Sequence, residues 1–176
     1  ICNNEEIVLS NAFEENTSSI FWNTDGDGGF LNSNTTNTVY SLGNNDLSSD
    51  TIILILSGFN QACPLVTDSL IVISRPQPTS NLIGEGDVCD DGSSTTIFAS
   101  FTGTPPFSYT IGNGVFNTQQ TTNNFIDSLT TTDEGFFLIS SLEDQYCEGI
   151  SNGVVQIIRR PIPIAEFSAY PFETDI

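Results

Sequence analysis

The chain repeats itself, and a pair of cysteines marks each copy. Cys2 and Cys63 lie 61 positions apart, and Cys89 and Cys147 lie 58 positions apart. The second pair follows the first by 87 and 84 positions. This period predicts an array of similar domains, and such arrays more often space, display or adhere than catalyse.

Aromatic residues and prolines repeat in step with the cysteines. Trp22 stands 20 positions after Cys2, and Tyr109 stands 20 positions after Cys89. We expect both aromatics to belong to a core rather than to stack on sugars. Each copy closes with an apolar run followed by Arg and Pro-x-Pro. These closing segments are residues 75–78 and 160–163.

The Pro-x-Pro segments predict the domain boundaries, because proline cannot donate to a strand ladder and favours extended backbone. We expect a first β-sandwich over residues 1–75, a linker over 76–80 and a second sandwich over 81–160. Residues 161–176 are predicted to be a linker and the start of a third, truncated domain. Short proline-containing linkers resist bending, so the array is expected to form a semi-rigid rod.

The predicted fold class is all-β, with tandem antiparallel β-sandwiches of immunoglobulin-like architecture. Helical periodicity is nearly absent, and short runs rich in Ile, Val, Phe, Leu and Thr recur between Gly, Asn, Asp and Pro clusters. The predicted strands are residues 6–10, 19–23, 30–31, 38–41, 51–57 and 65–74 in the first copy, and 95–101, 107–111, 114–117, 124–128, 135–141 and 152–159 in the second.

The four cysteines allow three disulfide connectivities. The repeat favours Cys2 with Cys63 and Cys89 with Cys147, because a bridge inside each copy lets each copy fold alone. The other connectivities would join neighbouring domains. A bridge that closes a loop of about 60 residues stabilises by roughly 4 kcal/mol in the chain-entropy model. Disulfides also indicate an oxidising compartment, so we expect an extracellular protein.

The charge excludes several classes of partner. The chain has 22 acidic residues, three arginines, no lysine and no histidine, and its formal net charge is −19. Phosphate backbones and anionic lipids repel such a chain, so we expect neither nucleic-acid binding nor binding to a membrane surface. No apolar run reaches the roughly 18 residues of a membrane span, so we expect no direct membrane insertion and place any signal or anchor outside this segment.

Catalysis is a poor interpretation of this composition. General bases at neutral pH are most often histidines, and the absence of lysine removes Schiff-base and Ser-Lys chemistry. A carboxylate pair that cleaves glycosides is the remaining enzymatic alternative, but no motif places such a pair. We therefore predict that the chain is not an enzyme and holds no organic cofactor.

Calcium is the one ion with candidate ligands. Asp25 and Asp27 alternate with glycines, as oxygen ligands of calcium often do, but Asp-Gly is also a common hairpin turn. Asp87, Asp90 and Asp91 form a second candidate near the predicted linker, where calcium would stiffen a rod. An ordinary turn and a solvated acidic loop are the favoured alternatives at the two places.

Three stretches of the chain resemble known repeats. Residues 22–30, with 39–40, 43–46, 52–56 and Cys63, are similar to PKD-like and immunoglobulin-like repeats of Bacteroidota surface proteins, which include gliding-motility adhesins and other type IX secretion substrates. Residues 101–109 with Tyr146 and Cys147 resemble a related repeat of the same proteins. Residues 163–171 are similar to the start of a PKD-like domain. The matched residues are Trp22-Asn-Thr-Asp-Gly-Asp-Gly-Gly-Phe30, Val39-Tyr40, Gly43-Asn-Asn-Asp46, Ile52-Ile-Leu-Ile-Leu56, Phe101-Thr-Gly-Thr-Pro-Pro-Phe-Ser-Tyr109 and Pro163-Ile-Ala-Glu-Phe-Ser-Ala-Tyr-Pro171.

The resemblance implies export to the outer-membrane exterior and a role in surface attachment or gliding. It implies neighbouring repeats as partners, the secretion and attachment machinery through flanking domains, and surface polysaccharide. Segments of Asp, then Ser or Thr, then an apolar residue also resemble the O-glycosylation acceptor motif of exported Bacteroidota proteins, with Thr51, Ser69 and Ser128 as acceptors. Such short segments also arise by chance near strand starts.

Two functions follow. The first is a non-catalytic structural or adhesive repeat module of a large secreted adhesin. The alternative is a carbohydrate- or protein-binding module with its own ligand on loops such as residues 25–29 and 112–114. A eukaryotic adhesion ectodomain, with a glycosylation sequon at Asn16, is less consistent with the lysine-free composition.

Overall fold

Short β-branched and aromatic runs become strands, and turn-forming residues separate them. A computed structural model describes residues 1–3 and 5–168, and this part of the chain contains no α-helix and one short 3-10 turn, η1 (Asp46–Ser48). The predicted all-β fold class is confirmed. The strands are β1 (Ile7–Leu9), β2 (Ser19–Thr24), β3 (Gly29–Phe30), β4 (Thr38–Ser41), β5 (Thr51–Asn60), β6 (Cys63–Ile73), β7 (Thr79–Ile83), β8 (Gly86–Cys89), β9 (Thr95–Thr102), β10 (Phe107–Gly112), β11 (Asn117–Thr122), β12 (Ile126–Thr131), β13 (Gly135–Glu143), β14 (Ile150–Asn152) and β15 (Val155–Arg160).

Strands β1 to β6 form what we call the N-terminal sandwich. One sheet has the order β1-β4-β3 and the other β2-β5-β6, and all of their pairs are antiparallel. Apolar side chains of both sheets meet between them. The buried cluster is Leu9, Trp22, Tyr40, Ile52 and Leu54. The indole Nε1 of Trp22 donates to the carbonyl of Thr35 at 2.9 Å, so this core aromatic is satisfied.

Strands β7 to β15 form what we call the C-terminal sandwich. A five-stranded sheet, β11-β10-β13-β15-β8, faces a four-stranded sheet, β12-β9-β7-β14. The pairs β15–β8 and β14–β7 are parallel, and the other pairs are antiparallel. Tyr109 lies in the core as predicted, and its hydroxyl donates to Asp127 Oδ2 at 2.8 Å. Burial, reinforced by that carboxylate, raises the pKa of Tyr109.

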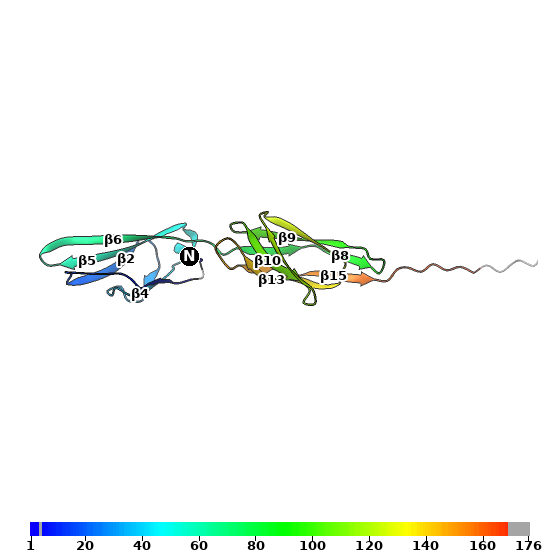
Figure 1. The fold of residues 1–176 in the computed structure, drawn as a ribbon, viewed down its shortest axis with the longest axis horizontal. Coiled ribbons are helices and arrows are strands. Elements are labelled where there is room, and N and C mark those ends of the chain that lie inside the picture. The colour runs from blue at the N-terminus through cyan, green and yellow to red at the C-terminus, as the bar shows by residue number, and fades with distance from the viewer. Residues whose placement is uncertain (4, 169–176) are drawn as a thin grey trace, which may run out of the picture.

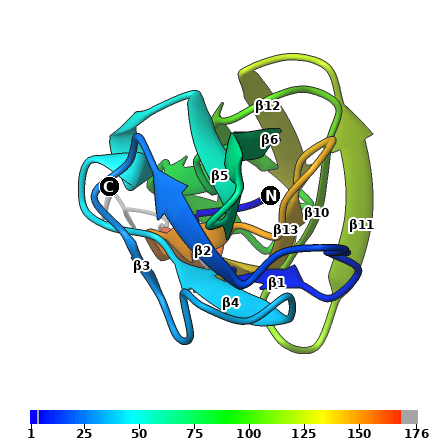
Figure 2. The ribbon, with the colours of Figure 1, turned by 90° about the vertical axis from the view of Figure 1, so that its left-hand side faces the viewer.

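The two sandwiches follow one another along the long axis of the molecule (Figure 1). The β5–β6 hairpin lies at the outer end of the N-terminal sandwich, whereas the N-terminus lies close to the C-terminal sandwich. Figure 2 looks along this axis and separates β2 and β5 from the sheet that contains β1 and β4.

Eleven of the twelve predicted strands lie near observed strands, whereas the strand predicted over residues 114–117 is wrong except at Asn117, where β11 begins, and β7, β8 and β14 were missed. Thr79 and Ser80, which we assigned to the linker, are the first residues of β7. Residues 161–168 contain no strand, and residues 169–176 of the predicted third domain lie outside the described residues. The domain boundaries themselves stay a prediction.

A buried carboxylate joins the loops of the N-terminal sandwich. Asp46 is only 1% exposed, and it accepts the Tyr40 hydroxyl at 2.7 Å and the amides of Gly43 and Gly28 at 2.9 and 3.0 Å. The amide of Asp27 donates to the other oxygen at 3.1 Å. Burial opposes ionisation of Asp46, but these donors outweigh it and hold the pKa of Asp46 below its usual value.

We expect Asp46→Asn to lower the free energy of unfolding by about 1–3 kcal/mol, because buried amides lose a charged acceptor. A depressed folded pKa contributes stability above the unfolded value near 3.8, and that stability is lost as the pH falls through the folded value. The difference between wild type and variant in urea unfolding should therefore begin to shrink only below about pH 4 and disappear below the folded pKa of Asp46. Asp50→Asn, at an exposed position, is the control. A difference that does not change with pH would contradict this role.

Candidate functional site: a cross-linked joint between the sandwiches

A disulfide crosses from one sandwich to the other. Cys2 bonds Cys147, with a Cα–Cα distance of 5.8 Å and a sequence separation of 145. The predicted pairing inside each copy is wrong, and Cys63 and Cys89 are free. The observed bridge is one of the connectivities that join neighbouring domains.

The directions of the strands explain why the cysteines do not pair inside each copy. Cys2 lies beside Arg75 at the end of the N-terminal sandwich that meets its neighbour, whereas Cys63 lies in the β5–β6 hairpin at the opposite end (Figure 1). Cys147 lies in the turn after β13, at the joint, whereas Cys89 ends β8 at the far end of the C-terminal sandwich. The length of a sandwich separates the cysteines within each copy.

Backbone hydrogen bonds hold Cys2 in place. Cys2 and Arg75 form a parallel β-bridge, in which the Arg75 amide donates to the Ile1 carbonyl and the Asn3 amide donates to the Arg75 carbonyl, both at 3.0 Å. The Cys2 amide donates to Glu5 Oε2 at 3.0 Å. Residues 1–3 are thereby fixed to Arg75, where the chain leaves the N-terminal sandwich.

Asp144 holds the turn that carries Cys147. Its Oδ1 accepts the amides of Tyr146 and Cys147 at 2.8 and 2.7 Å, and its Oδ2 accepts the amide of Thr104 at 2.8 Å. Both bonded cysteines are buried, with Cys2 7% and Cys147 4% exposed. The bridge is therefore shielded from soluble reductants as well as fixed in position.

Three further contacts lie at the joint and its connecting segment. The Arg75 guanidinium lies 3.7 Å from the centroid of the Tyr146 ring, a cation–π geometry. On the connecting segment, the Gln77 side-chain amide donates to the Glu148 carbonyl at 3.3 Å, and the Ile150 amide donates to the carbonyl of buried Pro78 at 2.9 Å. The connection is thus packed onto the C-terminal sandwich rather than free in solvent.

The candidate calcium ligands have protein partners. Asp25 Oδ1 accepts the Ile53 amide at 2.7 Å, and Asp27 Oδ1 accepts the Asn45 amide at 3.0 Å. Asp87 pairs with Arg160 at 2.8 Å, Asp90 with Arg159 at 3.8 Å, and Asp91 accepts the Ser93 amide at 2.9 Å. No three His, Cys, Asp or Glu side chains of the described residues are grouped to hold a metal. Calcium binding stays a prediction.

The other candidate positions are exposed. Thr51 begins β5, Ser69 lies within β6 and Ser128 lies within β12. Their glycosylation stays a prediction, as does ligand binding by the loops at residues 25–29 and 112–114. No helix in the described part of the chain has the length and apolar character of a membrane span.

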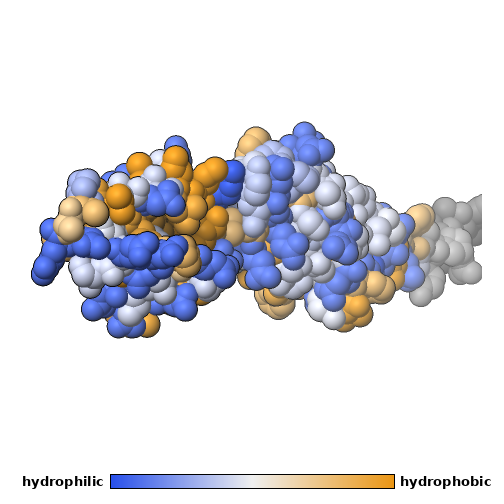
Figure 3. Space-filling view, turned by 60° about the vertical axis from the view of Figure 1, so that its left-hand side comes forward, coloured by the Kyte–Doolittle hydropathy of each residue, from blue (hydrophilic) through white to orange (hydrophobic). Residues whose placement is uncertain are grey.

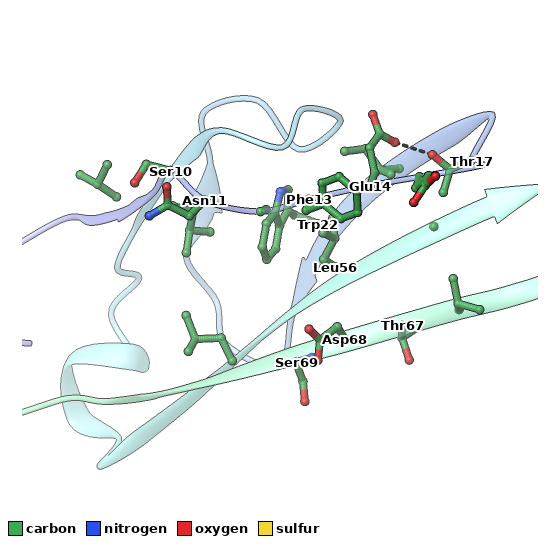
Figure 4. A pocket seen from close by; sticks show the side chains of 18 residues that line it. Ser10, Asn11, Phe13, Glu14, Thr17, Trp22, Leu56, Thr67, Asp68 and Ser69 are labelled. Atoms are coloured by element: carbon green, nitrogen blue, oxygen red, sulfur yellow. Dashed lines mark hydrogen bonds between the residues drawn. The ribbon is translucent and has the colours of Figure 1, made fainter.

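A groove of about 820 Å³ opens on the N-terminal sandwich. One wall is the irregular segment over residues 10–17, the other is the middle of β6 (residues 66–70), and Trp22 and Leu56 lie between them (Figure 4). Apolar side chains gather on the surface of this sandwich (Figure 3). Phe13 and Val66 line the groove and are largely exposed.

Comparison with solved structures identifies the architecture. The chain is similar to the titin I-band fragment I67–I69, with 14% identity and a TM-score of 0.50, over 91% of this chain and 61% of that one. It also matches the N-terminal four immunoglobulin domains of Dscam1 isoform 8.4, with 7% identity and a TM-score of 0.39, over 91% of this chain and 42% of that one. The chain therefore spans less than two thirds of the length of these structures.

The likeness to the titin fragment shows an immunoglobulin-like fold in tandem. No protein-family model matches the chain. No curated protein matches it either. The fold and the joint thus define an immunoglobulin-like tandem whose two units are covalently joined across their boundary.

Sequence reasoning missed most of the joint. It singled out Tyr146 only for its place next to Cys147, and it did not pair that ring with Arg75. Asp144 gave no signal beyond its place in an ordinary turn sequence. The one usable signal was that Cys2 precedes the first predicted strand, which places it at a domain end.

We expect thiol reagents to label two cysteines per native chain, Cys63 and Cys89, and non-reducing peptide mapping to recover Cys2 bonded to Cys147. Cys2→Ser should lower the free energy of unfolding, with an upper value of about 5 kcal/mol from the chain-entropy model for a loop of this length. Cys63→Ser is the matched control and should leave stability unchanged. Recovery of a peptide that links Cys2 to Cys63 would contradict the assignment.

Proposed function

We propose that the chain is a non-catalytic, rigid spacer segment of a large secreted cell-surface adhesin that serves surface attachment or gliding motility. The observation that carries this proposal is the buried Cys2–Cys147 disulfide across the joint. A bridge there adds little to the chemistry of either sandwich, but it fixes their relative orientation. Orientation matters to a protein that transmits force or holds a binding site away from a surface.

Several observations support the extracellular and adhesive parts of the proposal. A disulfide persists in oxidising compartments, and immunoglobulin-like tandems resemble structural and adhesive modules. The Bacteroidota lineage and type IX export rest on the sequence resemblance of residues 22–63, 101–147 and 163–171. Surface polysaccharide and the attachment machinery are the partners that this lineage implies.

Small-angle scattering tests the spacer role. The oxidised protein should give one narrow distribution of interatomic distances with a long maximum, as expected for two sandwiches held end to end. The Cys2→Ser, Cys147→Ser double variant should give a broader distribution with a smaller radius of gyration, because the joint then bends. Cys63→Ser should match the wild type. Identical profiles for wild type and double variant would contradict a disulfide-stiffened rod.

A glycan array with the whole chain separates a spacer from a ligand-binding module. We expect no reproducible binding, because the loops at residues 25–29 and 112–114 consist of Asp, Asn and Gly and offer no aromatic side chain on which a sugar could stack. Binding that disappears when residues of one loop are replaced would assign the module its own carbohydrate ligand instead.

A further inference from the structure

The disulfide across the joint changes the covalent route by which tension passes through the chain. A pull applied before Cys2 and after Cys147 can follow the main chain or cross the bond between the two sulfurs. The main-chain route is 145 residues long, whereas the bond joins Cα atoms that lie 5.8 Å apart. The shorter route becomes taut first, so it takes the load. This holds for any point of pulling on the N-terminal side of Cys2 and the C-terminal side of Cys147.

The segment that tension bypasses is most of the described chain. Residues 3–146 contain all strands of the N-terminal sandwich and β7 to β13 of the C-terminal sandwich. The bond holds the two ends of this segment together, so a pull does not draw them apart. The β5–β6 hairpin, at the outer end of the N-terminal sandwich, is also the part that lies farthest from the bond in that sandwich (Figure 1).

The segment that remains under load carries the last two strands. Residues 147–160 contain β14 and β15, and β15 is held in parallel by β8 and antiparallel by β13. Its side chains Val155 and Ile157 are each 2% exposed. Cys147 lies at the joint and Arg160 at the far end of the sandwich (Figure 1). The pull therefore runs along β15 and loads its lateral hydrogen bonds together rather than one at a time.

Two of the three arginines attach side chains of β15 to its surroundings. Arg160 pairs with Asp87 of β8 at 2.8 Å, and the Arg159 guanidinium donates to the Thr132 carbonyl at 2.7 Å. Arg159 also lies 3.8 Å from Asp90. Exposed pairs of this kind contribute little each, but these lie on the strand that would slide out of its sheet under tension.

We propose that the Cys2–Cys147 disulfide is the load-bearing element of this segment, which carries tension past the N-terminal sandwich and delivers it to β15. This role rests on the proposed function as a spacer that transmits force, and it adds which residues bear that force. The N-terminal sandwich, with five residues in its buried apolar cluster, then lies outside the covalent load path. It can act as a spacer without resisting tension itself.

The free cysteines offer no internal route for opening this bond. Cys63 lies in the hairpin at the outer end of the N-terminal sandwich, and Cys89 ends β8 at the far end of the C-terminal sandwich (Figure 1). Thiol–disulfide exchange requires a thiolate that reaches one of the bonded sulfurs, and both bonded cysteines are buried. The bond therefore stays closed until an external reductant reaches it.

Single-molecule pulling of the whole chain, with handles at both ends, tests the load path. In the oxidised wild type, residues 148–160 should be drawn out in a step of at most about 50 Å, at the length of an extended residue. The Cys2→Ser, Cys147→Ser double variant should extend by about 500 Å more, the extended length of the 145 residues that the bond bypasses. Cys63→Ser is the matched control and should extend as the wild type does.

A wild-type chain that extends as far as the double variant would overturn the proposal. If the double variant does not fold, the wild type held at constant force gives the same test. Dithiothreitol reduces the bond to two cysteine thiols and is itself oxidised to its cyclic disulfide. The chain should then lengthen by about 500 Å in total, and no such lengthening would also overturn the proposal.

Asp46→Asn distinguishes a bypassed N-terminal sandwich from one that bears load. The substitution weakens this sandwich, but Asp46 lies inside the bypassed segment. In the oxidised chain it should leave the unfolding force unchanged. In the double-variant background it should lower the force of one unfolding step. A lower unfolding force in the oxidised chain would contradict the bypass.

The scattering comparison of the disulfide variant gives an independent result. An oxidised chain that is straight in solution but extends to its full length would contradict the load path and leave the spacer function intact. A chain that bends in solution but extends by only the short step would contradict the rigid spacer and leave the load path intact.

Discussion

The buried disulfide at the joint is the constraint on which the rest of the molecule depends. It connects residues 145 positions apart, so one bond closes nearly the whole of the described chain into a single loop. The other contacts across the joint are weaker. A cation–π pair and a few partly exposed hydrogen bonds contribute on the order of 1 kcal/mol each, which would allow the sandwiches to separate and bend. Because the bond is buried and both cysteines are held by backbone hydrogen bonds, the joint keeps its geometry.

The joint couples two units whose buried apolar clusters differ in size. The buried apolar cluster of the C-terminal sandwich has 13 residues, and that of the N-terminal sandwich has five. The N-terminal sandwich therefore has the smaller core. The N-terminal sandwich compensates with polar order, in which the carboxylate of Asp46 gathers three amides and a hydroxyl. Its open groove is the structural reason for the small core, because no strand of the described chain covers Trp22 and Leu56 there. The disulfide thus joins the unit with the smaller buried cluster to the unit with the larger one.

The sequence pattern correctly predicted those strands whose own residues favour extended structure. Thr51–Asn60 and Phe107–Gly112 are apolar and β-branched or aromatic, and their strands lie where the sequence placed them. β7, β8 and β14 were missed because each is short and rich in polar residues or glycine, so only partners far along the chain make them strands. The cysteine pairing failed for a related reason. Spacing along the chain says which cysteines are equivalent, but the direction of β8 and of the β5–β6 hairpin decides which of them meet, and that direction is a property of the assembled sheets.

The positions of the three arginines relate to the strongly negative charge of the chain. A chain of net charge −19 repels itself, and the repulsion is greatest where two acidic sandwiches approach. All three arginines lie at the ends of a sandwich. Arg75 covers the Tyr146 ring at the internal joint, while Arg159 and Arg160 pair with Asp90 and Asp87 beside Cys89. The same sequence step, Arg followed by Pro-x-Pro, thus places both a cation and a stiff linker at the C-terminal end of each sandwich. Cations placed there lower the repulsion between neighbouring sandwiches and leave the sides of the rod acidic.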